Sequence, residues 1–245
     1  MTPAYSSLAA VYDRFTYDVD YAAFADFYEE AFARRGAAPK TLLDLGCGTG
    51  SLTALMASRG YELISADASP EMLSIAREKC SEINSEIAPL FLCQSMAQLD
   101  LYGTVDCALS SLDSLNYVPP EDLPEVFRRL NLFIEPGGLL IFDLLTPEHL
   151  RALDGSVSVD EDESALCLWR ADFDEEENAL FYGVDVFTKR GRFWQRESEE
   201  HIEYAHAPET ILSLLTRAGF SEIEQRTDFQ PDSGRLFIIA RNTRA

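Results

Sequence analysis

Positive charge is scarce in this chain of 245 residues. It has 20 Lys and Arg residues against 42 Asp and Glu, which gives a formal net charge of −22 at pH 7. Such a surface repels phosphate backbones and anionic lipid headgroups, because the binders of these polyanions usually carry the opposite charge. The composition therefore argues against nucleic-acid and membrane partners.

Cysteine pairs and long apolar runs are also missing. The five cysteines are odd in number and include no C-x-x-C pair, so the sequence supports neither a disulfide framework nor a zinc site. No stretch approaches the ~18 apolar residues of a membrane span, and the start of the chain lacks the basic and apolar regions of a signal peptide. We therefore expect a soluble cytoplasmic protein without a metal site.

Hydrophobic periodicity alternates between strand and helix over the first 145 residues. Apolar residues at helical spacing predict a helix from Tyr21 to Phe32. Short apolar runs predict strands at 41–45, 61–66, 87–93, 105–110 and 138–145. This alternation demands a parallel sheet covered on both faces. With two closing strands at 220–227 and 235–241, it predicts an α/β fold with a doubly wound, mostly parallel seven-stranded sheet.

The pattern changes after Pro147. Short alternating segments at 166–170, 180–187, 193–196 and 201–204 predict an antiparallel meander, with a hairpin turn at 189–191. The predicted parts are an N-terminal helical cap (1–36), a Rossmann-like domain (37–148 and 207–245) and an inserted antiparallel β lid or dimerisation subdomain (149–206). Because dimerisation is one of the two roles predicted for the insertion, the sequence leaves open whether the protein forms a homodimer.

The strongest functional signal lies between Leu43 and Gly50, where the sequence reads Leu-Asp-Leu-Gly-Cys-Gly-Thr-Gly. Glycines after a parallel strand let the backbone turn sharply and approach a ligand that a Cβ would keep away. Asp67 follows the next strand, 21 residues after Gly46, where a carboxylate can accept hydrogen bonds from both hydroxyls of a ribose. Together these residues predict a site for an adenosine-containing cofactor.

Two sequence features distinguish between a dinucleotide and S-adenosylmethionine as the cofactor of this predicted site. The dinucleotide fingerprint G-x-G-x-x-G needs its third glycine where Ser51 stands. Asp44 lies two residues before the glycine loop, where a carboxylate repels a pyrophosphate but tolerates the cationic ammonium and sulfonium groups of S-adenosylmethionine. The residues therefore favour S-adenosyl-L-methionine.

The same segment resembles the first motif of the class I S-adenosylmethionine-dependent methyltransferases, which reads hydrophobic-Asp-hydrophobic-Gly-x-Gly-x-Gly. The resemblance extends through Asp67 and the helix start at 68–73 to the segment 113–117 and the turn at 135–138. The N-terminal segment 5–13 is similar to that of small-molecule and uncharacterised bacterial members, in which it folds over the cofactor. The resemblance thus implies methyl transfer to an acceptor.

It also implies a set of cofactor-binding residues. Backbone near Gly46 and Gly48 would hold the methionyl end of the cofactor, and Asp67 would bind its ribose. The family's usual acidic residue after the third strand is missing, so the adenine amine would meet Gln94, Ser95 or a backbone carbonyl. Ala68 and Met72 would flank the adenine ring. The full expected set is Tyr12, Asp44, Gly46, Cys47, Gly48, Asp67, Ala68, Met72, Gln94, Ser95, Met96 and Ser110.

The acceptor side is defined by fewer residues. Asp113, Asn116 and Tyr117 lie where open α/β sheets bind their substrates. Methyl transfer from a sulfonium is an in-line displacement, so alignment is the main task, and Asp113, Tyr117 or a histidine from the meander would serve as the catalytic base. The expected acceptor-binding residues are Tyr5, Asn116, Tyr182, Tyr204 and His206.

We therefore interpret the chain as a methyltransferase acting on a nitrogen or oxygen nucleophile of a small molecule, which the acidic surface fits. Two alternatives remain open. A tRNA- or protein-modifying methyltransferase needs a basic groove, and the only local basic cluster consists of Lys189, Arg190, Arg192 and Arg196. A non-catalytic S-adenosylmethionine-binding module would keep the fold without turnover.

Overall fold

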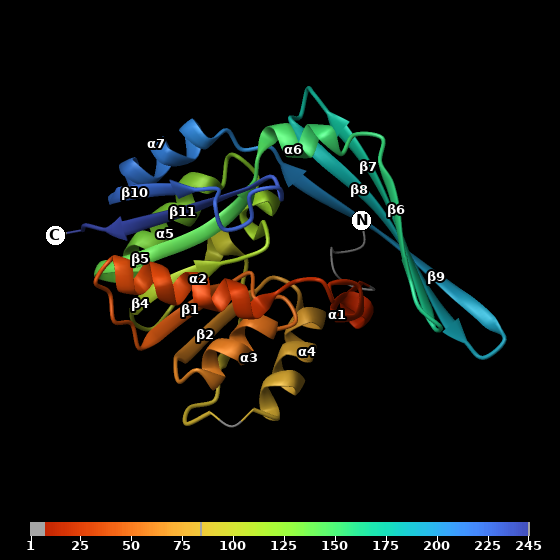
Figure 1. The fold of residues 1–245 in the computed structure, drawn as a ribbon, viewed down its shortest axis with the longest axis horizontal. Helices are drawn as coiled ribbons and strands as arrows, with labels where there is room; N and C mark the ends of the chain where they lie inside the picture. Colours follow the sequence, from red (N-terminus) through yellow and green to blue (C-terminus); the bar gives the residue numbers. More distant parts are fainter. Residues whose placement is uncertain (1–7, 84, 245) are drawn as a thin grey trace.

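Two β-sheets and the helices around them make up the computed structural model, which describes residues 8–83 and 85–244 (Figure 1). The strands of the larger sheet are β1 (Thr41–Leu45), β2 (Glu62–Asp67), β3 (Leu90–Cys93), β4 (Val105–Ser110), β5 (Ile134–Leu145), β10 (Phe220–Arg226) and β11 (Arg235–Asn242). The α-helices are α1 (Tyr12–Phe15), α2 (Tyr21–Arg34), α3 (Ser51–Ser58), α4 (Pro70–Ser81), α5 (Leu123–Phe133), α6 (Pro147–Ala152) and α7 (Pro208–Ala218). The 3-10 helices are η1 (Leu8–Val11), η2 (Met96–Gln98) and η3 (Ser114–Tyr117).

The larger sheet has the strand order β10-β11-β5-β4-β1-β2-β3. Strands β1 to β5 pair in parallel, whereas β11 is antiparallel to both β5 and β10. The predicted doubly wound, mostly parallel seven-stranded sheet is therefore confirmed. The chain order reverses between β1 and β4, and open α/β sheets bind ligands beyond the carboxyl ends of their strands at such a point.

This sheet is buried on both faces, because successive side chains of a strand point to opposite sides. On β1, Leu42 packs with Phe24 and Met56 in the core under α2 and α3. The next residue, Leu43, packs with Phe127 in the core under α5 and α7. These two cores fix the carboxyl ends of β1, β2 and β4 side by side, so the loops that follow them share one edge of the sheet.

The smaller sheet is antiparallel, and it extends from the larger one as a long twisted ribbon (Figure 1). Its strands lie in the order β6 (Val157–Glu161), β7 (Ala165–Asp174), β8 (Ala179–Arg190) and β9 (Phe193–Tyr204). The predicted inserted antiparallel meander is confirmed, although β9 is one strand where the sequence predicted two, and β6 was not predicted. The division of the chain into domains stays a prediction.

The N-terminal helices pack against the smaller sheet. Leu8 and Val11 of η1 share a small apolar core with Cys167, Val184 and Val186. This contact brings α1, which follows η1 directly, to the space between the smaller sheet and the loop after β1 (Figure 1). Within the described part of the chain, no helix is both long and apolar enough to cross a membrane.

Candidate active site

The glycine loop after β1 forms the floor of the site. Gly46 has a φ of +74°, and a Cβ added there would lie 2.8 Å from the Cβ of Ser114, so only glycine fits. Gly48 also has a positive φ, of +53°, but an added Cβ would meet nothing within 4 Å. Gly46 therefore packs against the loop after β4, whereas Gly48 presents bare backbone to open space.

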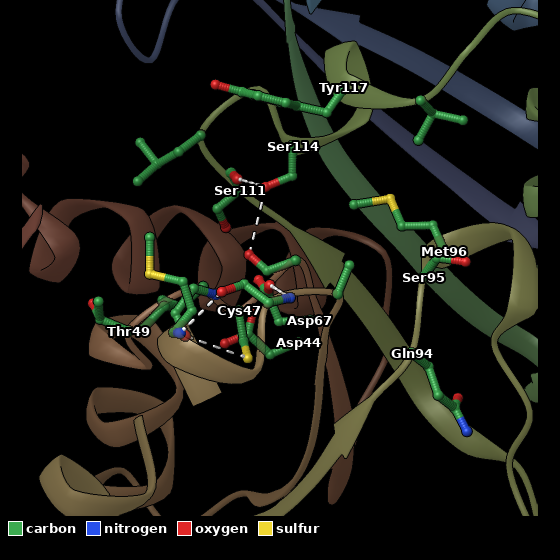
Figure 2. Close-up of a pocket in the computed structure, with 18 of the residues that line it drawn as sticks. Asp44, Cys47, Thr49, Asp67, Gln94, Ser95, Met96, Ser111, Ser114 and Tyr117 are labelled. Carbon is green, nitrogen blue, oxygen red and sulfur yellow. Dashed lines mark hydrogen bonds between the residues drawn. The ribbon is translucent and has the colours of Figure 1, made fainter. Parts of the chain in front are cut away.

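Asp67, at the end of β2, is held in place by the loops on either side. Its Oδ2 accepts the backbone N–H of Gly48 and its Oδ1 accepts that of Ser69, both at 2.8 Å (Figure 2). Burial raises the pKa of Asp67, and these two hydrogen bonds oppose that rise. Because a carboxylate oxygen has more than one lone pair, each oxygen keeps acceptor capacity for a ligand.

Asp44 lies at the base of the glycine loop and is only 2% exposed. Its Oδ2 accepts a hydrogen bond from Thr53 Oγ1. Burial raises the pKa of Asp44 to about 6, although the bond from Thr53 opposes the shift. The carboxylate is thus ionised near neutral pH and adds negative charge under the loop.

These three features border a cavity of about 420 Å³, within the range of small-molecule sites. Eleven of the twelve residues predicted from the sequence to bind the cofactor line it, and so does Tyr117 on the opposite wall (Figure 2). The eleven are Tyr12, Asp44, Gly46, Cys47, Gly48, Asp67, Ala68, Met72, Gln94, Ser95 and Met96. Further lining residues, which were not predicted from the sequence, are Tyr21, Thr49, Ser111, Leu112 and Ser114.

One lining side chain is already engaged elsewhere. The amide of Gln94 donates to the carbonyl oxygen of Asp100 at 3.3 Å and accepts the Asp100 N–H at 3.0 Å. In Figure 2 it points away from Asp44 and Asp67. Of the groups predicted to meet an adenine amine, Ser95 and the nearby backbone are therefore better placed than the Gln94 side chain.

Several predicted residues lie outside the cavity. Ser110, at the end of β4, is 1% exposed and sits within the sheet. Tyr182 packs against Trp169, with 6.3 Å between ring centroids. Tyr204 stacks on His206, whose Nε2 lies 3.2 Å from the carbonyl oxygen of Leu115. Burial lowers the pKa of His206, so its ring is neutral near neutral pH. Tyr5 lies outside the described residues.

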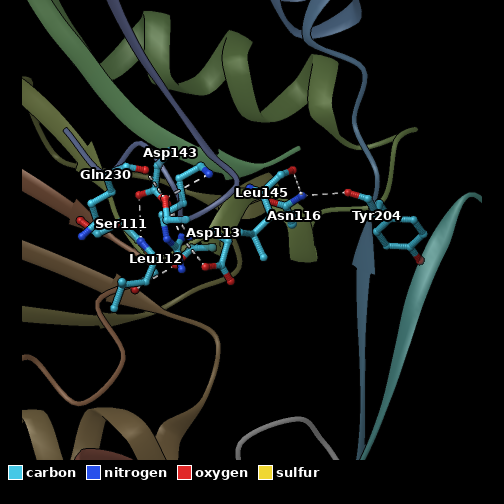
Figure 3. Close-up of polar contacts among 12 residues, drawn as sticks. Ser111, Leu112, Asp113, Asn116, Asp143, Leu145, Tyr204 and Gln230 are labelled. Carbon is cyan, nitrogen blue, oxygen red and sulfur yellow. Dashed lines mark hydrogen bonds and ion pairs between the residues drawn. The ribbon is translucent and has the colours of Figure 1, made fainter. Parts of the chain in front are cut away.

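Asp113 also turns away from the cavity, into an ionic cluster that the sequence analysis missed. Arg235 on β11 pairs with both Asp113 and Asp143, each at 2.5 Å. The two oxygens of Asp143 accept the backbone N–H groups of Leu112 and Asp113, at 2.9 and 3.0 Å (Figure 3). Both of these residues have left-handed backbone, with φ of 57° and 55°. The cluster therefore holds a strained turn that presents Leu112 to the cavity.

Asn116 joins the loop after β4 to the smaller sheet instead of facing a ligand. Its Nδ2 donates to the carbonyl oxygens of Leu145, at 3.2 Å, and Tyr204, at 3.0 Å (Figure 3). Its Oδ1 accepts the N–H of Leu145 at 3.0 Å. Asn116 is fully buried, so these bonds fix the end of β9 against η3.

Helix α1 lies across the site and is tied to both sides of it. Asp13 pairs with Lys79 of α4 at 2.7 Å and accepts a hydrogen bond from Thr49 of the glycine loop. The next residue, Arg14, pairs with Asp162 in the turn between β6 and β7. Tyr12, directly before them, lines the cavity.

Known proteins resemble this chain over nearly all of its length. A methyltransferase domain model matches residues 42–138. YqeM of Bacillus subtilis (strain 168), named among the methyltransferases, is 28% identical over 98% of each chain. The demethylmenaquinone methyltransferase of Thermus thermophilus is 30% identical over 75% of this chain and 76% of its own. The chain belongs to the S-adenosylmethionine-dependent methyltransferases. A solved member from Clostridium acetobutylicum ATCC 824 is 26% identical, has a TM-score of 0.84, and is matched over 98% of this chain and 99% of its own.

S-adenosylmethionine is the cofactor of this family, and the residues present fit it. The open backbone at Gly48 leaves room for a ligand that a side chain would fill. The Asp67 carboxylate has acceptor capacity for hydroxyl donors. Asp44, buried and ionised under the loop, matches a ligand with cationic groups. The chain is therefore a methyltransferase with a cavity suited to its cofactor.

Proposed function

We propose that this methyltransferase acts on a nitrogen or oxygen nucleophile of a small molecule. The observation that carries the proposal is the continuity of the cavity, which runs from the glycine loop and Asp67 to a second wall with Leu112 and Tyr117. A volume of about 420 Å³ suits a small organic acceptor beside the cofactor.

In this proposal each wall has its own task. Asp67 accepts hydrogen bonds from the ribose hydroxyls, Ala68 and Met72 flank the adenine, and the backbone at Gly48 follows the methionyl end. S-adenosylmethionine supplies the electrophilic methyl group when it is bound. On the other wall, Tyr117 orients the acceptor nucleophile through its hydroxyl, and Leu112 shapes the apolar side of the pocket.

A macromolecular acceptor has less support. The net charge of −22 disfavours tRNA, because its phosphates are repelled by an acidic surface. Lys189 and Arg190 end β8 at the far tip of the smaller sheet, away from the loops after β1 and β4 (Figure 1). By its name, the Thermus relative acts on demethylmenaquinone, which also favours a small acceptor.

The proposal is tested by following the cofactor product. Purified protein is incubated with S-adenosylmethionine and a panel of small amines, alcohols and phenols, and in parallel with bulk tRNA and with cell protein. We expect S-adenosylhomocysteine, measured by mass spectrometry, to accumulate only with small molecules. Accumulation with tRNA or protein alone would contradict the proposal.

A further inference from the structure

Glu203, near the end of β9, is a buried carboxyl group that none of the roles above uses. It is 4% exposed. Its Oε2 is buried and has no hydrogen-bond partner within residues 8–83 and 85–244. A buried carboxyl with an unsatisfied oxygen is costly, so its presence needs an explanation.

Tyr117 connects this carboxyl group to the cavity. The tyrosine lines the cavity, and its hydroxyl lies close enough to the Glu203 carboxyl group to stabilise the charged form of that group. Two backbone contacts clamp the same junction, from Asn116 to the Tyr204 carbonyl oxygen at 3.0 Å and from His206 to that of Leu115 at 3.2 Å. The pairing of Tyr117 with Glu203 is therefore part of a fixed contact between η3 and β9.

Among the residues that the structure describes, cations are too few around this junction to balance its carboxylates. Asp113, from the turn before η3, and Arg235, from β11, act electrostatically on Glu203, and Arg235 is already shared between Asp113 and Asp143. The other titratable groups that face Glu203 are Tyr117 from η3 and Tyr182 from β8; on its own strand, two residues before it, lies His201. A positively charged acceptor would supply the cation that these carboxylates lack.

We propose that Glu203 takes up, through the hydroxyl of Tyr117, the proton that an amine acceptor loses on methylation. The inference rests on the proposed function, since it assigns the acceptor class of the same site. The acceptor nitrogen gives a proton to Tyr117 Oη while Tyr117 gives its own proton to the Glu203 carboxylate. The nitrogen's lone pair forms the new bond to the methyl group, the electrons of the broken carbon–sulfur bond stay on sulfur, and Glu203 ends neutral.

The acidity of the acceptor decides in favour of an amine. An alkylammonium resembles the lysine side chain, which loses its proton near a pKa of ~10. An aliphatic hydroxyl resembles water, with a pKa of ~15.7, which is far beyond the reach of a carboxylate. Burial raises the pKa of Glu203 well above its usual value, which makes it a stronger proton acceptor than an exposed glutamate. Glu203 is therefore suited to accept a proton that comes from an amine and not one that comes from an alcohol.

Proton counting during cofactor binding tests the role of Glu203 without turnover. Binding of S-adenosylmethionine and of S-adenosylhomocysteine is measured by calorimetry at about pH 8 in two buffers of different ionisation enthalpy. The two ligands share their amino and carboxyl groups, so the difference in protons released reports the response to the sulfonium charge. Asp44, with a pKa of about 6, is already ionised at this pH and does not contribute.

We expect S-adenosylmethionine to release more protons than S-adenosylhomocysteine, by up to about one per site. The difference should vanish in Glu203→Gln and persist in Glu200→Gln, a change on the exposed face of the same strand. An unchanged difference in Glu203→Gln, or none in the wild type, would overturn the inference. If neither ligand binds the wild type, the proposed function fails with it.

A second variant tests the relay and the acceptor class. Tyr117→Phe keeps the carboxyl group, so the proton difference should persist while turnover of small amines falls at least 100-fold. Wild-type turnover in this variant would overturn the relay, and this holds even if Glu203→Gln does not fold. Methylation of hydroxyl counterparts but not of amines would overturn the acceptor class, and methylation of neither would contradict the proposed function.

Discussion

Asp143 fixes the backbone of Asp113 in the left-handed conformation, since its Oδ2 accepts the Asp113 N–H at 3.0 Å. Asp143 is fully buried and also pairs with Arg235. Removing its carboxylate takes one of two anionic partners from Arg235 and leaves the backbone N–H groups of Leu112 and Asp113 without their acceptor. We expect Asp143→Ala to lower the free energy of unfolding by about 3 kcal/mol, measured by chemical denaturation.

The matched control for this variant is Asp232→Ala, which changes an exposed aspartate shortly before the start of β11. We expect its free energy of unfolding to stay within ~0.5 kcal/mol of the wild type. Equal stabilities for the two variants would mean that the cluster of Asp143 and Arg235 does not hold the turn.

Alanine substitutions at Gly46 and Gly48 should distinguish a glycine needed for packing from one that leaves space for a ligand. Gly48→Ala adds a Cβ in open space, so it costs only the ~1–2 kcal/mol of left-handed backbone. Gly46→Ala adds a clash at 2.8 Å with the Ser114 Cβ and should be clearly less stable. Both should weaken cofactor binding, measured by calorimetry. Equal denaturation midpoints would contradict the close approach of Gly46 to Ser114.

Asp67→Asn should weaken both S-adenosylmethionine and S-adenosylhomocysteine, because both carry the ribose. Loss of a charged hydrogen bond of ~1.5–3 kcal/mol corresponds to a rise in Kd of roughly 10- to 100-fold. Titration calorimetry measures both affinities, with Glu78→Gln on the exposed side of α4 as control. A loss confined to S-adenosylmethionine would show that Asp67 responds to the sulfonium and not to the ribose.

Asp44 should make stability depend on pH between about 4 and 6. Its pKa is raised in the folded protein from 3.8 to about 6, so the folded state binds the proton more tightly than the unfolded state. The stability that this contributes is complete below pH 3.8 and is lost as the pH rises through 6. We expect Asp44→Asn to remove a decline of about 3 kcal/mol over this interval, measured by denaturation at each pH. An identical decline in variant and wild type would rule out Asp44 as its source.

Local pattern was sufficient to predict the frame of the site. The bounds of β1 and β4 agree with the predicted strands at 41–45 and 105–110, because buried parallel strands are continuous apolar runs. The position of Asp67 beside the glycine loop followed from the rule that parallel strands end at one edge. Most residues that line the cavity around the glycine loop were thus predictable from the sequence.

The acceptor side depends on tertiary contacts, which local pattern does not contain. Asp143 and Arg235 lie 92 residues apart and meet only because β5 and β11 are neighbours. On β9, Glu199, His201 and Glu203 all face inward, the reverse of the usual strand pattern, so their polarity suggested exposure. A buried polar stripe of this kind becomes visible only once the fold is known.

The ties of α1 have a consequence for ligand exchange. Asp13 and Arg14 are neighbours of opposite charge, and they anchor one short helix to the cofactor loop and to the inserted sheet. A shift of either wall must therefore pull on Tyr12 between them. We therefore expect a displacement of one wall to be transmitted through α1 to the other, so that the two sides of the pocket open together.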